Sequence, residues 1–160
     1  MTLTQTRDGF TLIELLVVIG IIAVLAALLF TNFSGMRERA RDLQRKSDLG
    51  QVKGALRLYY NDYQKYPADN GSGVILGCGV NGTDACDWGT TFSAGAGSTI
   101  YMTQLPTDPV SASSYTYTYV DDDNFTITTT LENTSDDSAV KSQAKCGAQA
   151  NPETYVVCND

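Results

Sequence analysis

Glu14 is a carboxylate set into the most apolar part of the sequence. Residues 15–30, which follow it, read LLVVIGIIAVLAALLF and carry no charge. A charged side chain within a membrane-spanning segment costs on the order of 2.5–3.5 kcal/mol on insertion scales, so such a residue usually has a partner and a function. The chemistry that Glu14 indicates is therefore ion pairing, unless the residue simply lies at the membrane interface near the start of the segment.

Four cysteines make up a second chemical feature, and all of them follow the apolar segment: Cys78, Cys86, Cys146 and Cys158. An even number of cysteines beyond such a segment indicates disulfides in an oxidising compartment. Three pairings are possible, and the sequence favours the local one, which closes two short loops by joining Cys78 to Cys86 and Cys146 to Cys158. Free thiols or a zinc site fit less well, because the spacings are not CxxC-like and the chain has no histidine.

Catalytic chemistry finds little support in the sequence. No histidine is present, no serine or cysteine has an evident base, and no glycine-rich phosphate loop follows a predicted strand. We expect a protein that is not an enzyme.

The parts of the chain that must position these residues differ sharply in charge. From residue 64 onward there are twelve acidic and three basic residues, a net charge of -9, whereas residues 37–57 hold seven basic and three acidic ones. A surface as acidic as the C-terminal part repels phosphate backbones, so we expect no direct nucleic-acid binding by that part.

Residues 31–66 predict an amphipathic stem helix that follows the apolar segment. The region is rich in strong helix formers and has no proline before Pro67, so we expect the helix to end at Tyr66-Pro67. Five apolar residues recur at intervals of three and four and so share one helical face: Leu49, Val52, Leu56, Tyr59 and Tyr63. We expect this face to pack on the head's sheet rather than on a separate coiled-coil partner.

Residues 67–160 predict a globular head that is rich in β-structure and contains the disulfides. Residues 115–120 (YTYTYV) and 125–131 (FTITTTL) alternate in character and flank an acidic stretch at 121–124, which predicts a hairpin. Residues 68–98 are rich in glycine and asparagine and predict a long connection stapled by a short disulfide. The pattern of residues 133–160 places no strand.

Three interpretations compete for the N-terminus. A secretory signal would need a shorter apolar stretch and a small-residue cleavage site after it. A plain membrane anchor fits the length, since about 20 residues cross a bilayer, but it leaves Glu14 unexplained. Third, GFTLIELLVVIGIIAVLA resembles the class III signal of type IV prepilins and type II secretion pseudopilins: a short polar leader that ends in glycine, then Phe, then Glu at the fifth mature position.

The resemblance implies how this segment is processed. A membrane aspartyl prepilin peptidase would remove the leader, residues 1–9, by cutting between Gly9 and Phe10, and the new amine of Phe10 would be N-methylated. That cationic amine, in a neighbouring subunit, would be the partner of Glu14, and we expect this ion pair to set the axial stagger of the subunits. Segment 10–30 would span the membrane, in contact with lipid, before assembly and form the filament core afterwards.

The resemblance also implies a fold and a metal. LPTDP at 105–109 and YYNDYQKYP at 59–67 resemble the head of a small pilin or major pseudopilin. The implied fold is α+β and type IV pilin-like: the apolar half of a long N-terminal helix protrudes, and its amphipathic half packs on a small antiparallel sheet. Major pseudopilins bind calcium near their C-termini, which makes Asp121 and Asp123 candidate ligands, but Phe125 breaks the EF-hand spacing and favours a solvated turn. We expect no other metal or cofactor.

The basic residues after the apolar segment conflict with this topology. Five follow it closely, against Arg7 alone before it: Arg37, Arg39, Arg41, Arg45 and Lys46. The positive-inside rule alone would therefore keep the C-terminus in the cytoplasm. The cysteines and the leader favour the opposite orientation, a single-pass protein of the cytoplasmic membrane whose head lies outside the cytoplasm.

Three functional hypotheses follow. The first is a major pilin, a self-polymerising subunit of an extracellular filament for adhesion, twitching motility or DNA uptake, built on an inner-membrane assembly platform. The second is a pseudopilin of a type II secretion system. The third is a monomeric, membrane-anchored head that binds a ligand. The four cysteines, and Val110-Ser111 in place of the pseudopilins' usual Trp-Gly after LPTDP, favour the pilin.

Overall fold

The computed structural model describes residues 9–30, 33–96, 99–111, 113–148 and 151–159. It divides into two compact units, the second of which begins at Glu38. The head, residues 67–160, belongs to this second unit. Residues 1–8 of the expected leader and residues 31–32 of the expected stem lie outside the described residues. Helix α1 spans Leu12–Phe30 in the first unit, and helix α2, Phe33–Tyr63, continues into the second. The predicted α+β layout is confirmed.

Helix α2 buries the apolar face that the sequence predicts. Leu49, Val52 and Leu56 are fully buried in the head's core, and Tyr59 is nearly so. Tyr63, in the last turn, is partly exposed and stacks on Tyr59 with their ring centroids 4.4 Å apart. The helix is therefore held to the head along one side by apolar packing.

Helix α2 ends at Tyr63, so the predicted end at Tyr66 is wrong by three residues. Gln64 adopts a left-handed conformation with φ 54°, and its amide donates to the carbonyl of Tyr60 at 2.7 Å, which closes the helix. Tyr66 then turns into the core, where its ring packs edge-on against Phe125. The chain thus leaves the helix before the proline requires it.

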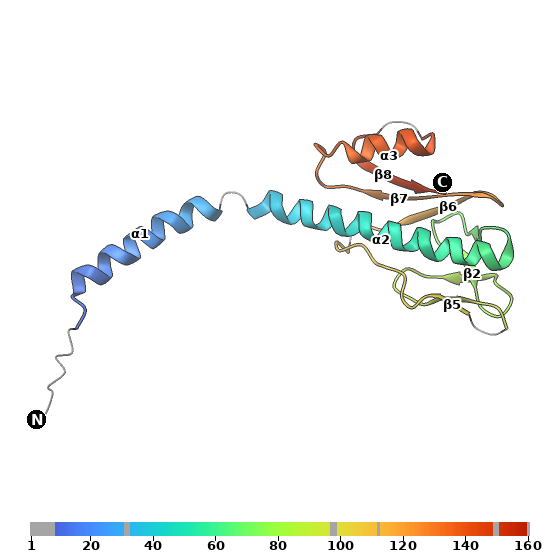
Figure 1. Cartoon of the computed structure of the whole chain (residues 1–160), viewed down its shortest axis with the longest axis horizontal. Coiled ribbons are helices and arrows are strands. Elements are labelled where there is room, and N and C mark those ends of the chain that lie inside the picture. The colour runs from blue at the N-terminus through green and yellow to red at the C-terminus, as the bar shows by residue number, and fades with distance from the viewer. Residues whose placement is uncertain (1–8, 31–32, 97–98, 112, 149–150, 160) are drawn as a thin grey trace, which may run out of the picture. The chain divides into compact units, whose positions relative to one another are not determined.

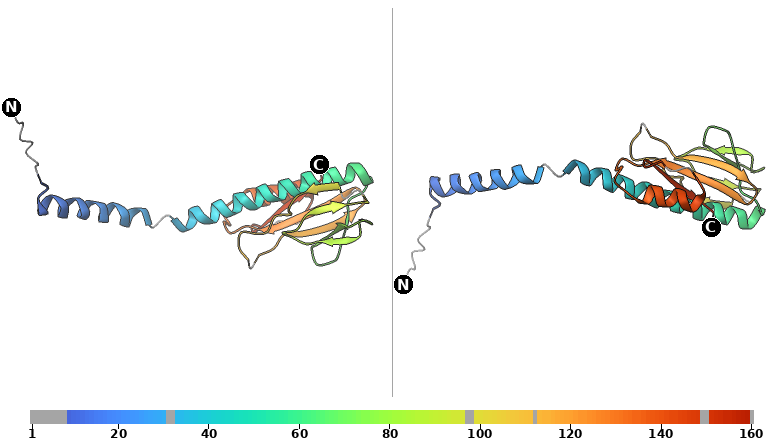
Figure 2. Two further views of the ribbon diagram at one scale, coloured as in Figure 1. Left: turned by 90° about the horizontal axis from the view of Figure 1, so that it is seen from below. Right: turned by 90° about the horizontal axis from the view of Figure 1, so that it is seen from above.

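Three small antiparallel sheets complete the head. Strands β6 (Thr116–Asp121), β7 (Asn124–Thr130) and β8 (Thr154–Cys158) form one sheet in the order β6-β7-β8. Strands β1 (Ala68–Asp69), β2 (Ile75–Cys78) and β3 (Asp84–Cys86) form a second, and β4 (Phe92–Ala94) pairs with β5 (Thr99–Met102). Figures 1 and 2 show all of them lying along the C-terminal half of α2.

The structure confirms the predicted hairpin and corrects two other predictions. Strands β6 and β7 pair antiparallel around the acidic stretch 121–124, with a shift in register between Tyr119 and Asp121. Residues 68–98, predicted as a long connection, instead contain four short strands, β1 to β4. The tail, in which no strand was placed, forms helix α3 (Ser138–Cys146) and strand β8, which extends the hairpin by pairing with β7. The head's sheet is therefore completed by the end of the chain.

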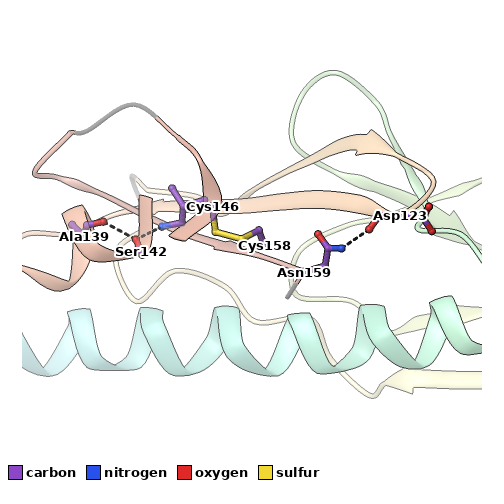
Figure 3. The surroundings of a disulfide bond; sticks show 7 residues. Asp123, Ala139, Ser142, Cys146, Cys158 and Asn159 are labelled. Atoms are coloured by element: carbon purple, nitrogen blue, oxygen red, sulfur yellow. Dashed lines mark hydrogen bonds between the residues drawn. A yellow bond between two sulfur atoms is a disulfide. The ribbon is translucent and has the colours of Figure 1, made fainter. Parts of the chain in front are cut away.

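Both disulfides have the local pairing that the sequence favours. Cys78 is bonded to Cys86 and joins β2 to β3, while Cys146 is bonded to Cys158 and joins the end of α3 to β8. Beside the second bridge, the Ser142 hydroxyl accepts a hydrogen bond from the amide of Val156, so α3 is also tied to β8 by a polar contact (Figure 3).

Candidate functional site

Gly9 and Phe10, between which cleavage is expected, are exposed to solvent in the structure. Gly9 and Phe10 precede the first turn of α1 and are exposed, and the Phe10 side chain is 90% accessible. An exposed peptide bond between these two residues, outside any helix or strand, is accessible to a protease. Because Gly9 precedes Phe10 in this sequence, the nitrogen of Phe10 is an amide, and the ammonium predicted to pair with Glu14 would exist only after the expected cleavage.

Glu14 already has a partner within its own chain. Its Oε2 accepts hydrogen bonds from the amide of Thr11 at 2.9 Å and from the Thr11 hydroxyl at 2.7 Å, and the Glu14 amide donates to the same hydroxyl at 3.4 Å. This is a capping box, in which the residue before the helix and the third helical residue satisfy each other's free groups. Sequence reasoning missed Thr11, although the T-x-x-E spacing before an apolar run indicates such a box.

Helix α1 presents apolar side chains on every side. The large apolar residues from Leu12 to Leu25 are each more than half exposed. By length and hydropathy, no helix within the described ranges qualifies as a membrane span. A solvated surface of this kind is unfavourable by about 25 cal/mol for each Å² left uncovered, so α1 requires an apolar partner.

A buried ion cluster fastens α2 to the head. The Arg45 side chain is 1% exposed and makes a bidentate pair with Asp108, whose side chain is 0% exposed, at 2.7 and 2.8 Å. Its Nη1 also donates to Asp42 at 2.8 Å and to Glu132 at 2.7 Å. Asp108 belongs to the connection between β5 and β6, and Glu132 follows β7. The cluster therefore joins three distant parts of the chain.

The same cluster orders the chain after β7. The carboxylate of Asp42 accepts the backbone amides of Glu132 and Asn133 at 3.0 and 2.9 Å. Glu132 is also paired with Arg41, and hydrogen bonds from Arg41 and then from Arg45 lower the pKa of Glu132 to about 2. Because each buried carboxylate has hydrogen-bonding partners, the cluster avoids the cost of an unpaired buried charge.

Two further polar contacts lie next to this ion cluster along α2. Lys46 forms an ion pair with Asp136, whose pKa it lowers to about 2. The Tyr115 hydroxyl donates to the buried carboxylate of Asp48 at 2.7 Å, and burial raises the pKa of Tyr115 far above its ordinary value. Three of the five basic residues that conflicted with the predicted topology, Arg41, Arg45 and Lys46, are thus used to hold the head.

The calcium candidates are engaged in their own turn. Asp121 accepts from the amide of Asp123 at 2.9 Å and from the side chain of Asn124, and Asp123 accepts the hydroxyl of Tyr60. Among the residues that the structure describes, no three acidic, histidine or cysteine side chains gather in a way that could hold a metal.

The head also contains a groove lined by lysines that the sequence did not reveal. It has a volume of about 430 Å³, lies between α2, α3 and β8, and is lined by four of the chain's five lysines: Lys46, Lys53, Lys141 and Lys145. These lysines come from segments nearly a hundred residues apart, so only the fold brings them together. Two of them are paired with carboxylates, Lys46 with Asp136 and Lys141 with Asp137.

Comparison with known proteins finds one matching family model and several similar proteins. The family model described as the prokaryotic N-terminal methylation motif matches residues 5–30. The chain is 35% identical over 105 residues to type II secretion system core protein G of Klebsiella pneumoniae, a match that covers 66% of this chain and 70% of that protein.

Two pilus proteins match over shorter stretches. Fimbrial protein EcpC of Eikenella corrodens is 40% identical over 80 residues, which are 50% of this chain and 52% of that protein. The type IV wide pilus major component PilA4 of Thermus thermophilus is 38% identical over 73 residues, 46% of this chain and 56% of that protein. No solved structure matches the chain significantly.

Proposed function

Because this chain belongs to the family of type IV pilins and type II secretion pseudopilins, we propose that it is the major structural subunit of a type IV pilus. The observation that carries the proposal is α1, an uncharged surface after Glu14 that has no cover within its own unit and follows an exposed Gly9-Phe10 bond. Covering α1 with copies of itself turns an unfavourable surface into the core of a polymer. The protein acts by assembling and not by catalysis.

The proposal assigns a course of events to the N-terminus. The apolar segment is held in the cytoplasmic membrane, in contact with lipid, with the head outside the cytoplasm, and prepilin peptidase cuts between Gly9 and Phe10. Cleavage converts the Phe10 amide into an ammonium, which is methylated and can then pair with Glu14 of a neighbouring subunit. The Thr11 capping box keeps the Glu14 carboxylate hydrogen-bonded until that cation is present. An assembly platform in the inner membrane adds the subunit to the growing filament.

The N-terminal mass of the mature chain tests the processing steps. We expect a chain that begins with methylated Phe10, and an intact Met1 leader would instead support the monomeric anchored head. Glu14→Ala should reduce filament yield and randomise the order in which subunits join, since an unpaired Phe10 ammonium has no other carboxylate in α1. An unchanged yield and order would show that the ion pair does not set the register.

The second candidate is a type II secretion pseudopilin, and one observation favours it. The match to core protein G covers more of both chains than the matches to the two pilus proteins do. Against it stand the two disulfides of the head and the departure from Trp-Gly after LPTDP. Electron microscopy separates the candidates: abundant surface filaments with this chain as their main component indicate a pilus, and their absence at native expression indicates a pseudopilus.

A further inference from the structure

A small pocket lies where the C-terminal end of α2 meets the head. Its volume is about 300 Å³, the lower end of the range for small-molecule sites. Its lining comes from five parts of the chain: Tyr59 of α2, Pro67 after the helix, Leu76 of β2, Gly82 between β2 and β3, and Tyr119 of β6. The walls are therefore mainly aromatic and apolar, and they are held by separate elements of one compact unit.

Two buried tyrosines line this pocket without a partner for their hydroxyls. Tyr59 is 3% exposed and Tyr66 is 6% exposed, yet neither hydroxyl has a hydrogen bond among the residues that the structure describes. Buried hydroxyls normally have one. The other buried tyrosines follow this rule: Tyr101 donates to Asp62, Tyr115 to Asp48, and Tyr117 to the carbonyl of Pro67. The exceptions share one pocket, which indicates a hydrogen-bonding partner that enters from outside the chain.

The Tyr59 hydroxyl faces the pocket. A Cβ built at Gly82, which also lines the pocket, would lie 3.5 Å from this oxygen. Gly82 has φ 66°, a conformation that favours glycine, and the missing side chain leaves the hydroxyl uncovered. Burial raises the pKa of Tyr59, so the hydroxyl stays protonated and can both donate and accept a hydrogen bond.

Three polar residues complete the lining: Lys65, Thr83 and Asp122. Lys65 and Asp122 have opposite charges, so the pocket as a whole favours an uncharged ligand. The Tyr119 hydroxyl donates to Oδ1 of Asp122 at 2.8 Å and holds this carboxylate in place. Its Oδ2 accepts no hydrogen bond from the part of the chain that the structure describes. The lining thus offers donors and acceptors together.

We propose that this pocket binds an uncharged sugar ring. Such a ring has C–H groups on its faces and hydroxyls around its edge. The C–H groups match the negative faces of tyrosine rings, and the hydroxyls pair with Tyr59, Lys65 and Asp122. This binding site goes beyond the proposed structural role and does not depend on assembly.

A proline-rich peptide is the other ligand that tyrosine-lined sites commonly bind. Such a peptide is extended, at about 3.1 Å per residue, and needs a long groove rather than a pocket of about 300 Å³. Proline also has no N–H group to donate to Asp122. Size and hydrogen bonding therefore both favour the sugar.

The first test measures sugar binding by the full chain in a detergent that has no sugar head group. The methyl α- and β-pyranosides of glucose, galactose and mannose are titrated and followed by ligand-observed NMR. At least one should bind with a dissociation constant of about 1 mM, since a ring of about a dozen non-hydrogen atoms makes few contacts. Tyr59→Phe should weaken that binding about fivefold to tenfold. Its melting temperature should not change, because no hydrogen bond within the chain is lost.

Tyr115→Phe is the matched control. It removes a buried tyrosine hydroxyl that does have a partner, Asp48, and that lies outside the pocket lining. This variant should lower the melting temperature by several degrees and leave the dissociation constant of the sugar unchanged. Opposite effects of the two variants separate a hydroxyl that binds a ligand from one that stabilises the fold.

The second test closes the pocket. Gly82→Asn suits the left-handed backbone, because asparagine adopts this conformation more readily than most residues, and its side chain would lie beside the Tyr59 hydroxyl. Sugar binding should be lost while the head stays folded.

Three results would overturn the inference. They are no binding of any of the six glycosides below about 20 mM, wild-type binding by both Tyr59→Phe and Gly82→Asn, and tighter binding of a blocked proline hexapeptide than of any sugar. None of them bears on filament formation, which both pocket variants should retain. A wild-type chain that forms no filament would instead count against the proposed function, so the two failures are distinguishable.

Discussion

The ion cluster around Arg45 makes a quantitative prediction about the stability of the head. Arg45→Met keeps most of the side chain's apolar volume and removes its charge and all four of its hydrogen bonds. The change removes the arginine cation that pairs with the Asp108 carboxylate, which is 0% exposed, and with the Asp42 carboxylate. Both carboxylates then keep only hydrogen bonds from backbone amides, which offset part of the cost of burying their charge.

The expected loss is large compared with the total stability of a domain. Breaking a buried ion pair by removing one partner costs about 3–5 kcal/mol, whereas whole domains are stable by about 5–15 kcal/mol. For a unit of this size we expect the melting temperature to fall by about 10–20 °C. A second variant, Arg45→Met with Asp108→Leu, should recover part of the loss, because replacing both charges by apolar groups leaves less uncompensated charge in the core.

Thermal unfolding of the full chain in detergent, followed by circular dichroism, measures these changes. Arg39→Met is the control, since it removes an exposed arginine of the same helix and should alter the free energy of unfolding by less than about 0.5 kcal/mol. A loss below about 1 kcal/mol for Arg45→Met would refute the reasoning, because it would place the cluster among solvated surface pairs.

Three further predictions concern the head. The pKa of Glu132 is lowered to about 2 in the folded state, so the carboxylate stabilises the head fully above its unfolded pKa of about 4.3. The free energies of unfolding of the wild type and of Glu132→Gln, measured by urea titration, should therefore differ by a constant amount above about pH 4.5. This difference should shrink as the pH falls toward 2, and a difference that grows in acid would contradict the prediction. Replacing Cys146 and Cys158 by serine should destabilise the head by about 3 kcal/mol, because the bridge joins residues 12 apart in the sequence and so closes a loop in the unfolded chain. An unchanged melting temperature would contradict that role. Calcium at about 1 mM should leave the melting temperature unchanged, because the carboxylates of Asp121 and Asp123 already accept hydrogen bonds within the protein, and a clear rise would restore the calcium site.

Sequence reasoning predicted the parts of the fold that depend on local pattern. The face of α2 around Leu49 and Leu56 follows from helical spacing, and the hairpin follows from two alternating runs around an acidic turn. The pairing of the four cysteines also follows from their spacing, because two short loops can close without long-range information.

The parts that escaped prediction depend on contacts between distant residues. Strands β1 to β4 are two to four residues long and rich in residues that disfavour strands, so their pairing is set by neighbours in space. The Arg45 cluster joins Arg45 to a carboxylate 87 residues away, and no spacing rule reveals it. Helix α3 did have a local signal: Gly147, which caps it in a left-handed conformation with φ 67°, follows Lys145 in the last turn.

The basic residues after the apolar segment show how the demands of folding and of membrane orientation differ. In the proposed topology the positive-inside rule would act while the chain inserts, before the head folds, so Arg41, Arg45 and Lys46 would oppose export of the head at that stage. Once the head has folded, each of them is paired with a carboxylate from beyond residue 100. Their position after the apolar segment is therefore accounted for by the attachment of α2 to the rest of the head. It follows that neutralising Arg39, which forms no such ion pair among the residues that the structure describes, should ease insertion in the proposed orientation without destabilising the head, whereas neutralising Arg45 should also lower the head's melting temperature.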